Sequence, residues 1–164
     1  MNSHDWSKFL LRIPISAHRQ NIFDRWTSQS GLESWFLRQA LFFRNGKQLD
    51  PQTIIQVNDN YEWRWYGYPD EVTEKGNVLE LDKQKLKFSF GKAGNVTVSI
   101  KEEQGQNILE LLQDEIPEDE HSQFEYHIGC SKGWVYHLTN LKSILEGGLN
   151  LTNRDMKLKD VINS

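Results

Sequence analysis

Residues 133–148 read GWVYHLTNLKSILEGG, and this stretch decides the fold because its apolar residues recur at helical spacing. At 100° per residue, one narrow arc of the helix collects Ser131, Trp134, Leu138, Leu141 and Leu145. Glycines 147 and 148 then provide a stop signal. The pattern therefore predicts an amphipathic C-terminal helix that buries one face.

The start of this helix is expected at Pro117, which is followed by three acidic residues. Proline tolerates the first helical position, and carboxylates favour the positive end of the helix dipole. A helix of about 29 residues would span about 43 Å, enough to cross a sheet. Gly129 and Gly133 disfavour a helix interior, so a kink or a later start near them is the alternative.

Upstream, residues 40–114 change to short runs of period-two alternation, punctuated by turn pairs such as Asn45-Gly46 and Gly94-Asn95. Tyr61, Trp63 and Trp65 alternate with polar neighbours, which predicts a sheet with one aromatic face and one polar face. Residues 50–57 are expected to form an irregular connection. The predicted antiparallel strands cover 40–44, 60–68, 76–82, 85–90, 95–102 and 106–114.

Ahead of this meander, the apolar run Phe9 to Ile15 predicts a first strand over 9–16, with Pro14 suited to a sheet edge. Two short helices are expected next, and Gly31 is expected to separate them. Their apolar faces comprise Ile22, Phe23 and Trp26 in the first helix, then Leu32, Trp35 and Phe36 in the second.

This order of elements predicts the helix-grip fold of the α+β class. A curved antiparallel sheet of about seven strands carries two short helices after its first strand, and a long C-terminal helix lies across the sheet. The length of 164 residues fits one domain, which we expect over 9–151. Residues 1–8 and 152–164 are expected to be flexible or irregular termini.

The composition narrows the function classes. The 19 basic and 23 acidic residues give a net charge of −4, which argues against nucleic acid or an anionic membrane as the main partner. Cys130 is the only cysteine, and residues 1–8 lack the apolar core of a secretory signal, so a cytoplasmic protein is expected. No apolar run approaches the roughly 20 residues of a membrane span. We expect a monomer without a cofactor.

Six segments of the chain carry a resemblance to a known family: Ile15–Ala17, Ile22–Thr27, Gly31–Phe36, Gly133-Trp134, Leu138–Lys142 and Leu145–Gly148. On these segments the sequence resembles the activator of heat-shock protein 90 ATPase homologue family, C-terminal-domain type, in the START-like (polyketide cyclase and lipid-transport) superfamily. The resemblance implies a cavity between sheet and C-terminal helix, used across the superfamily for lipids, hormones and polyketides. The eukaryotic co-chaperones of the family carry an additional N-terminal domain, for which the residues before Phe9 leave no room, so ATPase activation is not expected.

Aromatic residues of the sheet and the helix form the candidate ligand site. Trp63, Trp65 and Phe88 are expected to converge on Trp134 and Leu138 if the helix lies over the aromatic face. Dense core packing by the same rings is the alternative. His127 lies on the same helical arc, either as a polar group in the pocket or as a buried histidine with its own hydrogen-bond partners.

Metal and catalytic sites are not expected. His127, Cys130 and His137 share one side of the helix, but the two histidines are separated by roughly 15 Å along its axis, too far for one ion. Glu80 and Glu110 lie in apolar strands without a histidine or second acid at a useful spacing. The sequence also lacks a nucleophile elbow, a phosphate loop and a paired-cysteine motif.

Three functional hypotheses therefore remain. The first is non-catalytic binding of a small apolar or aromatic molecule by Trp63, Trp65, Phe88, His127, Trp134 and Leu138. The second is a protein-interaction module that acts as a chaperone cofactor. The third, a cyclase-like or isomerase-like enzyme, requires an inward-facing acid or histidine.

Overall fold

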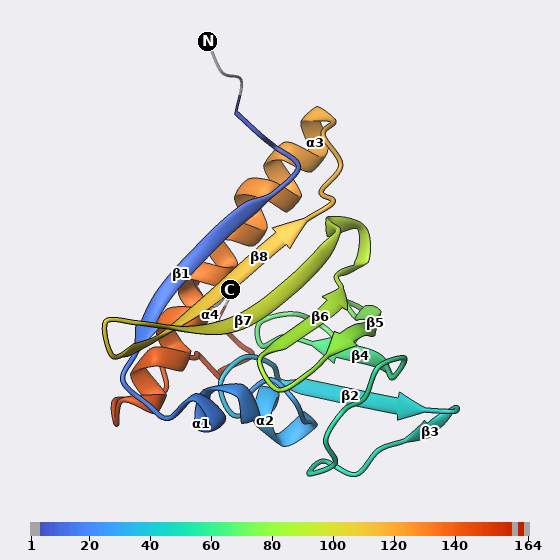
Figure 1. Cartoon of the computed structure of the whole chain (residues 1–164). Helices are drawn as coiled ribbons and strands as arrows, with labels where there is room; N and C mark the ends of the chain where they lie inside the picture. Colours follow the sequence, from blue (N-terminus) through green and yellow to red (C-terminus); the bar gives the residue numbers. More distant parts are fainter. Residues whose placement is uncertain (1–3, 159–160, 163–164) are drawn as a thin grey trace.

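The computed structural model describes residues 4–158 and 161–162, which form one curved sheet with helices on its concave side (Figure 1). All strand pairs in the eight-stranded sheet are antiparallel, in the order β1-β8-β7-β6-β5-β4-β2-β3. The strands are β1 (Phe9–Ile15), β2 (Gln39–Arg44), β3 (Lys47–Gln48), β4 (Asn60–Arg64), β5 (Glu74–Leu81), β6 (Lys85–Ser89), β7 (Asn95–Glu103) and β8 (Gln106–Asp114).

The predicted α+β helix-grip fold is confirmed, with one strand more than expected. The additional strand β3 arises because Asn45 and Gly46 both adopt positive φ, which reverses the chain tightly and pairs Lys47 with Arg44. The predicted strand over 60–68 is shorter than expected, because β4 ends at Arg64 and the chain leaves the sheet before Trp65.

The two short helices are α1 (Arg19–Asp24) and α2 (Gln29–Glu33). The predicted boundary at Gly31 is wrong, because Ser28 caps α2 by accepting a hydrogen bond from the Gly31 amide and so places this glycine inside the helix. A Cβ atom at Gly31 would lie 2.4 Å from the Asp24 carbonyl oxygen. The glycine therefore permits close approach of the two helices.

The C-terminal helix is continuous but changes its winding. It comprises α3 (Glu120–Ser122), the π-helical segment η2 (Gln123–Gly129) and α4 (Cys130–Leu145). The helix begins at Glu120 and not at Pro117, because the Asp119 carboxylate accepts hydrogen bonds from the Ser122 amide and hydroxyl and so acts as the N-cap. No kink at Gly133 is seen.

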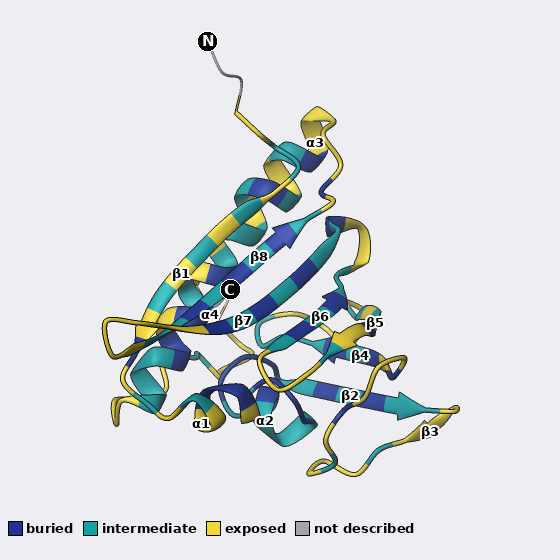
Figure 2. Ribbon diagram, in the orientation of Figure 1, coloured by how far each residue is buried: buried dark blue, intermediate teal, exposed yellow. Residues whose placement is uncertain are grey.

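The core lies between the helices and the inward face of the sheet. Figure 2 shows the alternation of buried and more exposed residues along β7 and β8, where the buried Val98 and Ile100 pair with Leu111 and Leu109 of the neighbouring strand. At the centre of this core, the Trp26 ring contacts the rings of Trp35 and Trp134. The curvature positions α4 over this aromatic surface.

Described residues near both ends of the chain pack on the domain. The Asn140 side chain, fully buried on α4, accepts a hydrogen bond from the Leu151 amide at 2.7 Å. At the other end, the rings of His4 and Trp6 contact His127 on η2. Among the described residues, no helix has the length and apolarity needed to cross a membrane.

Candidate functional site

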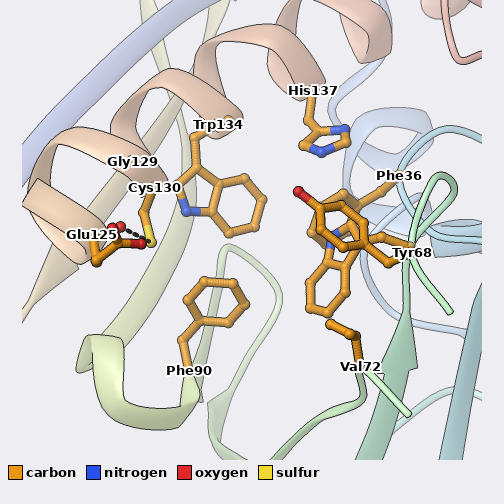
Figure 3. Close-up of a pocket in the computed structure, with 11 residues that line it drawn as sticks. Phe36, Tyr68, Val72, Phe90, Glu125, Gly129, Cys130, Trp134 and His137 are labelled. Atoms are coloured by element: carbon orange, nitrogen blue, oxygen red, sulfur yellow. Dashed lines mark hydrogen bonds between the residues drawn. The ribbon is translucent and has the colours of Figure 1, made fainter. Parts of the chain in front are cut away.

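A pocket opens beside the C-terminal helix (Figure 3), and its lining includes five phenylalanine, tyrosine and tryptophan rings. Its volume is about 310 Å³, within the range of small-molecule sites. We call it the aromatic pocket. Its lining residues are Phe36, Trp65, Tyr68, Val72, Phe90, Glu125, Gly129, Cys130, Gly133, Trp134 and His137.

Trp134 forms the inner wall of the aromatic pocket in a fixed orientation. Its indole nitrogen donates a hydrogen bond to the Gln113 side-chain oxygen at 2.9 Å, and the Gln113 amide donates to the Ala93 carbonyl at 2.9 Å. The Trp134 ring lies 5.0 Å from Phe36 and 5.6 Å from Phe90, measured between ring centroids. These contacts leave a broad apolar surface against which a flat molecule can pack.

His137 lies one helical turn after Trp134, at the opposite end of the aromatic pocket in Figure 3. Its side chain is buried, with 3% of the residue exposed, and neither ring nitrogen has a hydrogen-bond partner among the residues that the structure describes. The ring lies edge-on to Phe36, with the centroids 4.7 Å apart. Burial lowers the pKa of His137 to about 3, so the imidazole is neutral at physiological pH.

The C-terminal helix also contributes a thiol and a carboxylate to the wall. Cys130 is partly buried, and burial raises the pKa of its thiol. Glu125 contributes a carboxylate, and the part of the chain that the structure describes places no lysine or arginine in this lining. The wall therefore provides apolar surface, a neutral imidazole and negative charge.

The outer wall is a loop between β4 and β5 that contributes Tyr68 and Val72. Arg38 fixes the base of this loop, donating to the Asp70 carboxylate at 2.6 Å and to the Trp65 carbonyl at 3.2 Å. Tyr68 and Val72 themselves are 44% and 43% exposed. The loop is therefore anchored at its ends while its pocket-facing side chains remain accessible to solvent.

The structure brings two of the six predicted site residues into the aromatic pocket, Trp65 and Trp134. Trp63 and Phe88 lie deeper in the core, with their ring centroids 5.1 Å apart, and Leu138 is buried in that core as well. Their packing matches the alternative of a tryptophan-filled interior. Ligand binding by the six residues stays a prediction.

His127 does not line the aromatic pocket. Its Nδ1 lies 2.9 Å from the Trp6 carbonyl oxygen, and its Nε2 lies 3.1 Å from Nε2 of His4. Of the two roles considered for this residue, the structure shows the buried histidine with its own partners. The π-helical segment η2 carries it toward the N-terminal residues.

Sequence reasoning missed Phe36, Phe90 and His137. The signal for His137 was its position three residues after Trp134, which places both side chains on one helix face. Phe36 and Phe90 lie just outside regular elements, where periodicity gives no orientation. Only the packing of α2 and β6 against α4 brings them to the site.

The carboxylates considered for catalysis lie elsewhere. Glu80 pairs with Lys85, and Glu110 pairs with Arg12 at 2.9 Å and with Lys101 at 2.6 Å. Neither lines the aromatic pocket. No group of three or more metal-ligating side chains occurs within the described part of the chain.

A comparison with protein families matches most of this chain to one family model. The family model described as activator of Hsp90 ATPase homolog 1-like protein matches residues 16–146. A search of curated proteins found no match.

Solved structures share the fold at low sequence identity. A crystal structure of a protein from Staphylococcus saprophyticus has a TM-score of 0.66 at 16% identity, with 88% of this chain and 95% of that chain covered. The solution structure of the Aha1 dimer from Colwellia psychrerythraea has a TM-score of 0.64 at 15% identity, with 86% and 97% covered. DynU16, described as a putative protein in the dynemicin biosynthetic locus, has a TM-score of 0.63 at 13% identity, with 88% of this chain and 49% of that chain covered.

Proposed function

We propose that this chain, which belongs to the activator of Hsp90 ATPase homolog 1-like family, binds a small apolar or aromatic molecule in the aromatic pocket without catalysing a reaction. The observation that carries the proposal is the pocket itself, about 310 Å³ in volume and walled by Phe36, Trp65, Phe90 and Trp134. Rings that are already packed in place lose little freedom when a ligand binds, which favours affinity.

A non-catalytic role is supported by the acid–base character of the wall. A general base works best when its pKa lies near the operating pH. Burial holds the pKa of His137 at about 3, so this imidazole is a poor proton acceptor at neutral pH. Glu125 is exposed and lies beside Cys130, at the side of the aromatic pocket away from His137 (Figure 3).

The single cysteine offers a direct test of occupancy. Cys130 lines the aromatic pocket, and no other thiol competes for reagent. We expect a bound molecule to slow alkylation of Cys130 by N-ethylmaleimide and to change tryptophan fluorescence through Trp134. Fatty acids, flavonoids and polyketide-like aromatics form the screen, and a polar sugar of similar size is the negative control.

A substitution that fills the aromatic pocket should abolish both the slowed alkylation of Cys130 and the change in tryptophan fluorescence. Gly133 lies in the pocket wall on α4, so Gly133→Leu is expected to occupy the binding volume with its side chain. The exposed neighbour Lys132 provides the matched control, Lys132→Leu. If no compound protects Cys130, or if Gly133→Leu binds as well as Lys132→Leu, the proposal is wrong.

A second candidate, a protein-interaction role as a chaperone cofactor, is favoured by the family match over residues 16–146. Pull-down of the host's heat-shock protein 90 and an assay of its ATPase activity distinguish it. Binding of that chaperone that persists in Gly133→Leu would support interaction through another surface, whereas no capture at high micromolar concentration removes this candidate.

A further inference from the structure

The His137 imidazole is a buried polar group of the aromatic pocket for which the described residues provide no hydrogen-bond partner. Buried polar side chains are hydrogen-bonded in the large majority of cases, because an unpaired donor or acceptor has lost its water. With 3% of the residue exposed, both nitrogens of His137 lack a partner while the ring lines the aromatic pocket. The fold has therefore already desolvated this group before any ligand binds.

The chemistry of the partner follows from the imidazole. A neutral imidazole presents one N–H donor and one bare nitrogen acceptor. A hydroxyl group can donate or accept, so it satisfies whichever nitrogen faces the ligand. Figure 3 shows the Tyr68 side chain pointing toward His137 from the loop, at the open side of the aromatic pocket.

The rest of the wall restricts the charge and shape of the ligand. Glu125 contributes negative charge, and none of the described residues that line the aromatic pocket is a lysine or arginine, which disfavours an anion. The Phe36 ring centroid lies 4.7 Å from that of His137 and 5.0 Å from that of Trp134, so this ring contacts both the imidazole and the indole. A flat ring packed on Phe36 and Trp134 would bring a substituent on its edge to the imidazole.

We propose that the ligand of this site is a neutral phenol, an aromatic molecule whose hydroxyl group hydrogen-bonds to His137. This inference rests on the proposed function, since it specifies what the aromatic pocket binds. His137 is the specificity-determining residue, and the apolar rings supply most of the contact area.

Two probes of similar size test the inference, 2-naphthol and 2-methylnaphthalene, which differ by a hydroxyl in place of a methyl group. Isothermal titration of the full chain gives the ratio of their dissociation constants in the wild type and in His137→Leu. We expect this ratio to change by about tenfold in favour of 2-methylnaphthalene when the imidazole is removed. His137→Gln, which keeps a donor and an acceptor, should retain part of the preference for 2-naphthol.

A second measurement on the wild type keeps the inference testable if His137→Leu does not fold. The ¹⁵N resonances of the His137 ring should shift with 2-naphthol and stay nearly unchanged with 2-methylnaphthalene. An equal ratio in wild type and His137→Leu, or equal ring shifts with both probes, overturns the phenol assignment while pocket binding stands. If neither probe nor any screened compound protects Cys130 from alkylation, the proposed function is wrong and the phenol assignment with it.

Discussion

Gln113 fixes the orientation of the Trp134 ring in the aromatic pocket. It is a fully buried polar side chain on β8, and it bridges the Trp134 indole and the Ala93 carbonyl. Gln113→Met leaves both groups unpaired in the core, so we expect the free energy of unfolding to fall by about 1–3 kcal/mol. Urea denaturation followed by tryptophan fluorescence measures the change.

The control for this prediction lies on the same strand. Gln106 is exposed near the start of β8, and Gln106→Met should change the free energy of unfolding by less than about 0.5 kcal/mol. Equal effects of the two substitutions would show that the hydrogen-bond bridge contributes nothing to stability.

His137 should make the stability of the fold depend on pH. Burial lowers its pKa to about 3, whereas an unfolded histidine titrates near pH ~6.5. Between these values the unfolded chain binds more protons than the native chain, so stability falls as the pH decreases. From pH 7 to pH 5 we expect the wild type to lose about 2 kcal/mol more than His137→Leu.

Other titrating groups are common to both proteins in this comparison. Tyr68, Glu125 and Cys130 line the aromatic pocket with His137 and are present in each. The exposed histidine at position 121 gives a matched substitution, His121→Leu, which shows whether loss of a surface histidine has the same effect. Parallel pH profiles for wild type and His137→Leu would contradict the prediction.

Among the elements, the C-terminal helix shows where sequence periodicity succeeds and where it fails. The arc of Trp134, Leu138 and Leu141 was predicted correctly as its buried face. The π-helical winding of η2 was not predicted. A turn that is wider by one residue changes the direction in which side chains point, but the amino-acid composition does not indicate it. The wider turn rotates His127 away from the arc on which uniform α-helical geometry places it.

The segment after the helix is held by Asn140. Its amide nitrogen lies 2.7 Å from the Trp35 carbonyl oxygen, and its oxygen accepts from the Leu151 amide. Asn140→Ala should release residues 149–152, remove the slow hydrogen exchange of the Leu151 amide, and lower stability by about 1–3 kcal/mol. Thr139→Ala, on the exposed side of α4, should have none of these three effects. Continued protection of Leu151 in Asn140→Ala would show that other contacts hold the segment.

At the scale of the whole molecule, the fold was more predictable than the site. Alternation along β7 and β8 identifies inward residues without knowledge of their partners. The site depends on which rings meet across the curved sheet, and the register shift between Val78 and Glu80 in β5 has no local signature. Trp65 and Trp134, two of the six residues named from the sequence, line the aromatic pocket, while Phe36, Phe90 and His137 required the packed structure. The expected monomeric state and cytoplasmic location stay predictions.

The extent of the domain leads to the last prediction. Trp26 from the segment after α1, Trp35 from the segment after α2 and Trp134 from α4 share one core with the sheet. If residues 9–151 form a single domain, the helices cannot melt apart from the strands, because they would expose the same core. We expect urea denaturation curves from tryptophan fluorescence, far-UV and near-UV circular dichroism to coincide, with one midpoint and one slope. Separate midpoints for the tryptophan and far-UV signals would show that the helical layer unfolds independently and would divide the domain.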